Sequence, residues 1–144
     1  MTTTNDQTVI TVAATVNAPI DIIWKAWTNP SDIKKWNAAS EDWHTTKAEN
    51  DLRPGGAFSS RMEAKDGSFG FDFGGIYDDV SPYELITYTL GDGRKVKITF
   101  EKNTDGVTIT ESFDAENTNP VEMQRAGWQA IMNNFKKHVE ASNA

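Results

Sequence analysis

The sequence predicts an α+β fold in which a curved antiparallel sheet grips one long C-terminal helix. Apolar residues recur with helical spacing over residues 119–140, which predicts a long amphipathic helix. Between residues 43 and 113, short runs rich in β-forming residues are separated by glycine turns, which predicts a series of antiparallel strands. The helix needs a large apolar surface to cover, and the sheet is the part of the chain that can supply it.

The N-terminal part of the chain predicts one strand followed by two short helices. Residues 1–7 are polar and are expected to fray, whereas residues 9–16 are rich in valine, isoleucine and threonine and predict a strand. A helix over residues 20–28 follows Pro19. An Asn-Pro dipeptide separates it from a second brief helical segment over residues 31–36.

The region after residue 43 predicts about six antiparallel strands. With the strand over residues 9–16 they make a sheet of six to seven strands. The dipeptide Asp66-Gly67 is typical of a hairpin turn, and Gly74-Gly75 predicts a bend or bulge where the sheet curves. The expected strands cover residues 45–49, 57–64, 69–77, 84–90, 95–100 and 107–113.

The long C-terminal helix carries clear start signals. Asn119 can serve as N-cap, Pro120 can take the first helical position, and Glu122 falls where a carboxylate can reach back to the cap. A strongly curved sheet rarely seals completely against a straight helix, so we expect a cavity between them. The apolar face of the helix consists of Val121, Trp128, Ile131, Met132, Phe135 and Val139.

Length and composition limit the classes of function. The chain has 144 residues, which predicts one domain, expected over residues 8–142. Its formal net charge of −7 argues against nucleic acid as a partner. The absence of cysteine excludes disulfides, thiolate catalysis and cysteine-ligated zinc. No run of residues is long and apolar enough for a membrane span, and we expect a soluble, cytoplasmic protein.

No motif for a metal, a cofactor or a catalytic group is recognisable. His44 and His138 are the only histidines; they lie far apart in sequence and lack nearby acidic residues at ligand spacing. Neither has the context of a serine-based triad, and Pro54-Gly55-Gly56 has the form of a turn before a strand rather than of a phosphate loop. We therefore assign no catalytic residue, metal ligand or cofactor-binding residue from the sequence.

A set of largely aromatic and apolar side chains is the candidate lining of the expected cavity. Most of these side chains taken alone are explained by ordinary core packing. Trp128 is an exception, because it can equally be a core residue or the floor of the cavity. Taken together, they suit a flat or lipid-like ligand, because aromatic and thioether groups adapt to apolar shapes. The set is Trp36, Trp43, Phe58, Met62, Phe71, Phe73, Tyr88, Phe100, Glu111, Gln124, Trp128, Ile131, Met132 and Phe135.

Glu111 differs from the rest of this set because it is an acid that shares strand parity with Ile109 and Phe113. A buried carboxylate without a partner is costly, so Glu111 is expected either at the rim of the sheet or paired. Arg125 and Gln124 on the helix are candidate partners. Our hypothesis is that Glu111 anchors the polar end of a ligand; the alternative is an ordinary rim carboxylate.

Several motifs occur in an order that resembles the activator-of-heat-shock-protein-90-ATPase-like family. They lie within residues 9–139 and cover nearly the whole chain. The family is similar in fold to the START-like, pollen-allergen-like helix-grip superfamily (SRPBCC). The motifs are VNAP at 16–19, IWKAWTNP at 23–30, IKKW at 33–36, DLRPGGAF at 51–58, GIY at 75–77, VSPYE at 80–84, YT at 88–89 and GW at 127–128.

Three functions remain open at this point. The resemblance implies a fold whose members hold apolar ligands between sheet and helix, so the first is non-enzymatic binding of a small apolar or aromatic molecule. The second, implied by the family name, is a protein-interaction module that acts on a chaperone or another protein. The third is an enzyme of cyclase or hydratase type that uses a cavity carboxylate or a tyrosine such as Tyr88. The one fold serves many tasks, so the site must decide among them.

Overall fold

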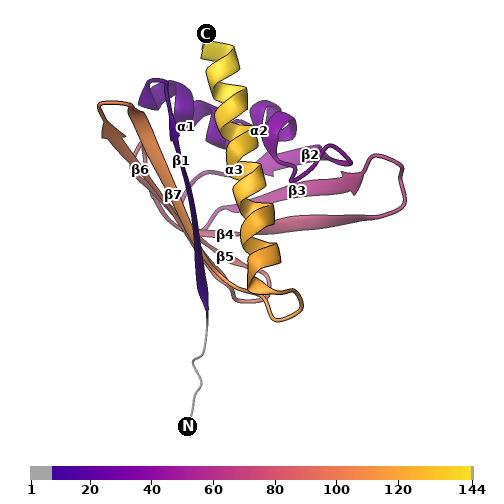
Figure 1. Cartoon of the computed structure of the whole chain (residues 1–144). Helices are drawn as coiled ribbons and strands as arrows, with labels where there is room; N and C mark the ends of the chain where they lie inside the picture. The colour runs from indigo at the N-terminus through magenta and orange to yellow at the C-terminus, as the bar shows by residue number, and fades with distance from the viewer. Residues whose placement is uncertain (1–7, 144) are drawn as a thin grey trace.

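The computed structural model of the protein describes residues 8–143 and confirms the predicted α+β helix-grip fold (Figure 1). Residues 1–7, where we expect a frayed terminus, lie outside the described residues. The elements follow in the order β1 (Val9–Val16), α1 (Ile20–Thr28), α2 (Pro30–Trp36), β2 (Trp43–Asn50), β3 (Ala57–Ala64), β4 (Gly70–Ser81), β5 (Leu85–Leu90), β6 (Lys95–Asn103), β7 (Gly106–Asp114) and α3 (Val121–Asn143).

The strands form one seven-stranded antiparallel sheet in the order β1-β7-β6-β5-β4-β3-β2. All neighbours after β1 are consecutive in sequence, as the series of glycine turns predicts. The first strand instead returns to pair with β7, which leaves β1 and β2 at the two edges. The sheet curves around α3, with β1 alongside the helix and β2 to β5 extending to its other side (Figure 1).

Glycines on β4 allow the neighbouring strands to approach closely. A Cβ atom added at Gly74 would lie 2.4 Å from the carbonyl oxygen of Phe58 on β3, and one added at Gly75 would lie 2.4 Å from that of Thr89 on β5. No side chain larger than hydrogen fits there without moving a strand. The register shift between β4 and β5 lies slightly beyond these glycines, between Tyr77 and Asp79, so the predicted irregularity is present but displaced.

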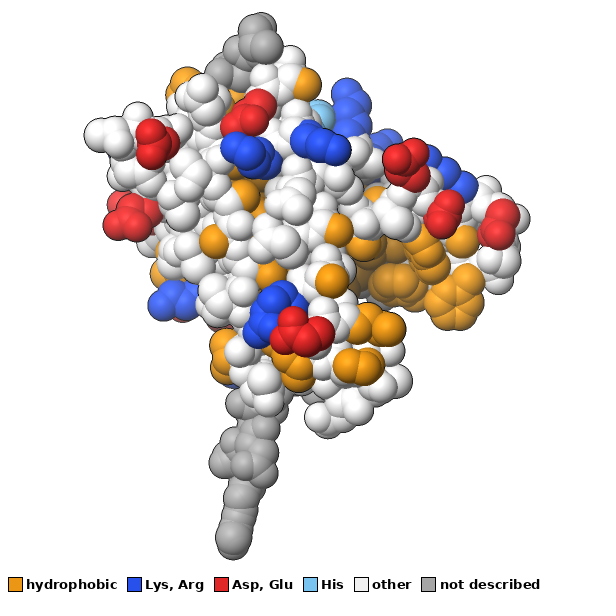
Figure 2. Space-filling view, in the orientation of Figure 1, with side chains coloured by type: hydrophobic (Ala, Val, Ile, Leu, Met, Phe, Trp, Pro, Cys, Tyr) orange, Lys and Arg blue, Asp and Glu red, His pale blue; other side chains and the backbone are white. Residues whose placement is uncertain are grey.

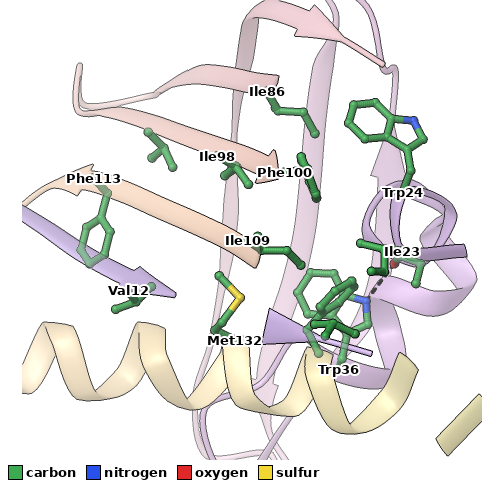
Figure 3. Packing of buried hydrophobic residues seen from close by; sticks show 14 of the residues in the cluster. Val12, Ile23, Trp24, Trp36, Ile86, Ile98, Phe100, Ile109, Phe113 and Met132 are labelled. Carbon is green, nitrogen blue, oxygen red and sulfur yellow. Dashed lines mark hydrogen bonds between the residues drawn. The ribbon is translucent and has the colours of Figure 1, made fainter. Parts of the chain in front are cut away.

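The core fills the space between the sheet and α3. Inward residues of β1, β6 and β7 meet the helix, as Figure 3 shows for Val12, Ile98, Ile109, Phe113 and Met132, which are all at most 2% exposed. Alternating residues of these strands are buried, which is the pattern of a sheet with one apolar face.

The short helices close one end of this core. Trp36 on α2 donates its indole N–H to the carbonyl oxygen of Ala26 on α1 over 2.9 Å, which ties the two helices together (Figure 3). Asp32 on α2 lies 2.9 Å from the imidazole of His138 on α3. The contact between Asp32 and His138 therefore holds α2, and α1 with it, beside the C-terminal half of α3. The N-terminal half of α3 faces a different environment.

The start of α3 differs from the predicted capping box. The helix begins at Val121, and the side chain of Asn119 donates to Glu116 rather than capping the helix. The side-chain amide of Gln124 ties the preceding loop to the helix: it accepts from the backbone N–H of Glu116 at 2.9 Å and donates to the carbonyl oxygen of Asn119 at 2.8 Å. Glu122 pairs with Arg125 one turn along the helix. Among residues 8–143, no helix is both long and apolar enough to cross a membrane.

Candidate functional site

A cavity of about 610 Å³ opens between the sheet and the N-terminal half of α3. Strands β2 to β5 and β7 form one side, α3 forms the other, and α1, α2 and the loop after α2 close one end. Its volume falls within the range of about 300–1,000 Å³ that is usual for sites that bind small molecules. This space remains because α1 and α2 pack beside the C-terminal half of α3. They cover the concave face of the sheet only there.

Most of the side chains that the sequence predicts for the cavity do line it. They come from five strands, two helices and chain positions up to 95 residues apart, so only the fold brings them together. This group is Trp36, Trp43, Phe58, Met62, Phe71, Phe73, Tyr88, Glu111, Trp128 and Ile131.

Four members of the predicted set lie elsewhere. Phe135 is fully buried between Trp27 and Trp36, with ring centroids 4.8 and 5.0 Å away, and Phe100 packs on Trp24 and Trp27. The other two are Met132, which is 1% exposed in the core, and Gln124, which bonds the backbone before α3. Helical phase and strand parity identify inward residues, but they do not separate the filled end of the core from the open end.

Trp128 belongs to both the core and the cavity wall. One face of its indole stacks on Phe113, with ring centroids 3.8 Å apart and planes inclined by 14°. Phe113 does not line the cavity, whereas Trp128 does. Phe73 approaches the indole edge-on at 6.0 Å. Trp128 therefore packs against the core residue Phe113 and also lines the cavity, and Phe113 fixes the position of the indole at the cavity wall.

Glu111 places a carboxyl group in this largely apolar space. It lies on β7 between Val12 of β1 and Ile98 of β6, and its side chain is only 7% exposed. It is not at the rim, and in the described part of the chain its carboxyl group has no hydrogen-bond or ion-pair partner. The candidate partners are engaged elsewhere, because Gln124 bonds the backbone and Arg125 bonds Glu122. Loss of hydration raises the pKa of Glu111 to about 8, so the group is a neutral acid at pH 7.

Two tyrosines add polar groups near Glu111. Tyr88 is 7% exposed; burial raises the pKa of its phenol well above the usual value, and the charge of Glu111 raises this pKa further. Its hydroxyl makes no hydrogen bond within residues 8–143. Tyr77, in contrast, donates to the side-chain oxygen of Asn50 over 2.5 Å, and Asn50 donates in turn to the carbonyl oxygen of Thr28. Glu111 and Tyr88 are thus two free polar groups of the cavity, whereas Tyr77 is held.

Sequence reasoning missed several lining residues. Tyr77 shares strand parity with Phe71 and Phe73, so alternation alone could have identified it. Trp27 lies on the same face of α1 as Ile23, and its helical phase is the signal for it. Loop positions carry no periodic signal, and glycine carries no side chain to point inward. The additional lining residues are Trp27, Ile33, Asn37, Ala39, Ser40, Ser60, Tyr77, Ile86, Asn119, Met123 and Gly127.

The mouth of the cavity is apolar and exposed. Phe71 is 41% exposed and Met123 is 60% exposed, yet both line the cavity. Phe69 is 64% exposed and its ring lies 6.0 Å from that of Trp43. Figure 2 shows hydrophobic side chains gathered beside the long helix, on the side of the molecule where β2 to β4 extend. In residues 8–143, no three histidine, aspartate or glutamate side chains cluster closely enough to hold a metal ion.

Comparisons with known proteins agree with this architecture. The model of the family described as activator of Hsp90 ATPase homolog 1-like protein matches residues 17–140. The AHSA1-like protein of Aeromonas hydrophila has a solution structure that is 43% identical, covers 94% of both chains and superposes with a TM-score of 0.88. No match is found among curated proteins.

Two further solved structures extend the comparison. A protein of Cytophaga hutchinsonii is 51% identical over 94% of this chain and 93% of its own, with a TM-score of 0.78. A protein of Chromobacterium violaceum is 26% identical over 92% of this chain and 96% of its own, with a TM-score of 0.82. The similarity spans nearly the full length of each chain.

Proposed function

This chain belongs to the family of activator of Hsp90 ATPase homolog 1-like proteins, and from its cavity we propose that it binds a small, mainly apolar molecule between the sheet and α3. The cavity has the size of a ligand site, and its walls are mostly aromatic. Such walls provide a large apolar contact area for a flat molecule. The proposed ligand has one polar end, and the rest of it is apolar.

The observation that carries this proposal is the isolation of Glu111. A buried polar group without a partner typically costs about 1–3 kcal/mol, and native proteins contain few of them. Glu111 is 7% exposed, lines the cavity and has no partner in the described chain. A ligand whose polar end reaches Glu111 supplies the missing interaction and offsets that cost.

Filling the cavity from α3 tests this proposal. A Cβ atom added at Gly127 meets no atom within 4 Å, and Gly127 lines the cavity. We expect Gly127→Leu to lower the affinity for 1-naphthylmethanol at least about tenfold, because the leucine occupies the space of the ligand. The same change should raise the free energy of unfolding by up to about 1 kcal/mol, since glycine is a poor helix former. Calorimetric titration and urea denaturation measure the two effects.

The neighbouring exposed position supplies the matched control. Ala126→Leu adds a leucine of the same size on the exposed side of α3, and we expect it to bind the probe as the unmodified protein does. The proposal is contradicted if Gly127→Leu binds 1-naphthylmethanol with unchanged affinity, because the probe would then occupy another place.

A second candidate function is supported by the exposed mouth. Phe69, Phe71 and Met123 form an apolar surface that a protein partner can cover. Activation of a chaperone ATPase, the activity in the family description, is the form of this candidate that an assay can address. An increase in the ATPase rate of an Hsp90-type chaperone that is lost in Phe69→Asp would favour this function over small-molecule binding.

The third candidate is catalysis by Glu111 as a general acid. A carboxyl group whose pKa is about 8 can donate a proton at neutral pH. Tyr88, whose pKa is raised in part by the charge of Glu111, is a group that could share the task. In the described residues no nucleophile or base is hydrogen-bonded to Glu111 or Tyr88, so binding accounts for the site with fewer assumptions than catalysis.

A further inference from the structure

We propose that the ligand of this cavity is an aromatic amine, bound as its ammonium cation by the carboxylate of Glu111. This inference rests on the small-molecule binding proposed above and specifies its chemical class. Three features of the cavity carry it: the sign of its charge, the aromatic character of its wall and the missing partner of Glu111.

The charge of the lining selects against anions. Glu111 is the only acidic or basic side chain among the residues that line the cavity, and the lining contains no lysine, arginine or histidine. A fatty acid or another carboxylate would therefore find no counterion in the cavity, and it would meet a like charge wherever Glu111 is ionised. The formal net charge of −7 for the whole chain adds a field that attracts cations and repels anions.

The aromatic wall favours a cation over a neutral polar group. Tryptophan is the best aromatic partner for a cation, and Trp27, Trp36, Trp43 and Trp128 all line the cavity. Phe113 covers one face of Trp128 at 3.8 Å from outside the cavity. An aromatic amine can stack its ring in this wall while its charge lies near Glu111.

Two free polar groups of the cavity can accept hydrogen bonds from an ammonium group. An ammonium nitrogen carries three N–H donors and no acceptor. The carboxyl group of Glu111 and the hydroxyl of Tyr88 have no hydrogen-bond partner in the part of the chain that the structure describes, and both can accept. The ammonium group of the ligand also supplies the counterion that the carboxylate of Glu111 lacks, and the low dielectric constant of the buried site strengthens the ion pair between them.

Ion-pair formation makes the binding depend on pH. The groups that face Glu111 from neighbouring elements are limited: β1 and β6 place Val12 and Ile98 beside it, and β5 contributes Tyr88. Tyr77 on β4 and Arg94 act on Tyr88. Both tyrosines stay neutral because their pKa values are raised. The titration between pH 6 and 8 therefore belongs to Glu111, whose pKa of about 8 means that ionisation limits cation binding below that pH.

Three probes with one ring system and different charges test this inference by calorimetry at pH 6, 7 and 8. They are 1-naphthylmethylamine, 1-naphthylmethanol and 1-naphthylacetate. We expect the amine to bind at least about tenfold more tightly than the alcohol at pH 8, and its affinity to rise by up to about tenfold per pH unit from pH 6. The alcohol should not gain affinity with pH, and the acetate should not bind.

Variants of Glu111 separate the ion pair from general apolar binding. Glu111→Gln keeps the shape of the side chain, and we expect it to lower amine affinity at least about tenfold and to remove its pH dependence while alcohol binding persists. Glu101→Gln is the matched control, since Glu101 is an exposed carboxylate on β6; it should leave both probes unaffected.

The possible failures are distinguishable. If the alcohol binds as tightly as the amine, or more tightly at low pH, the amine class is overturned and small-molecule binding stands, with the neutral Glu111 acid donating to the ligand. Tightest binding of the acetate also overturns the amine class. If no probe binds to the folded protein, both this inference and the proposed function are wrong.

Discussion

Replacing Glu111 with glutamine should make the stability of the protein less sensitive to pH. We expect the difference in the free energy of unfolding between Glu111→Gln and the unmodified protein to grow in favour of the variant by about 3 kcal/mol from pH 5 to pH 8. In the folded state the pKa of Glu111 is raised from 4.5 to about 8 by burial. Between these two values the unfolded chain has released the proton and the folded chain retains it. The free energy of unfolding of the unmodified protein therefore falls as pH rises from about 4.5 to 8, and glutamine removes this contribution.

Urea denaturation of both proteins at pH 5, 6.5 and 8 measures the effect. The difference between the two proteins isolates Glu111, because all other titrating groups are shared. Glu101→Gln should show the same pH dependence as the unmodified chain, since its carboxylate is exposed. A difference between Glu111→Gln and the unmodified protein that does not change with pH would mean that Glu111 is solvated or paired, contrary to the structure.

Truncating Phe135 should cost about 3–5 kcal/mol of the free energy of unfolding. Phe135 is fully buried, and its ring contacts Trp27 and Trp36 edge-on at 4.8 and 5.0 Å. Phe135→Ala removes these contacts and leaves a void in the part of the core where α1 and α2 meet α3. Urea denaturation of both proteins at the same pH measures the effect, because the contribution of Glu111 ionisation is common to the two proteins and cancels in the difference.

Met123 on the same helix provides the comparison. It is 60% exposed at the mouth of the cavity, so Met123→Ala should change the free energy of unfolding by no more than about 0.5 kcal/mol. Similar effects of the two substitutions would contradict the division of the helix face into a filled C-terminal end and an open N-terminal end.

The fold was predictable because its signals are local and repeated. The apolar spacing of α3, the glycine turns and the alternation in β6 and β7 each predict an element independently, and the structure contains all of them. The start of α3 was not predictable in detail. Asn119, Pro120 and Glu122 form a plausible capping box in sequence, but the carboxylate of Glu116 accepts from both the backbone N–H and the side-chain amide of Asn119. Gln124 bonds the loop before the helix.

The cavity was predictable as a set of inward side chains but not as a shape. Phe135 and Ile131 share one helix face, yet Phe135 packs against the tryptophans of α1 and α2 whereas Ile131 lines the open space. That difference depends on where α1 and α2 pack against α3. The spacing of apolar residues in the sequence does not predict that position. The position of Glu111 illustrates the same limit: parity places it inward, but only the structure shows that Gln124 and Arg125 are bound elsewhere.

The most direct test of ligand binding in the cavity follows the five tryptophan indole N–H resonances by NMR during titration with 1-naphthylmethylamine at pH 8. Trp27, Trp36, Trp43 and Trp128 line the cavity, whereas Trp24 packs against Tyr83 and Phe100 outside it. We predict saturable shifts of the cavity tryptophans, including Trp128, and little change at Trp24. Equal shifts at Trp24 and Trp128, or no saturable shift in the folded protein, would contradict a ligand site between the sheet and α3.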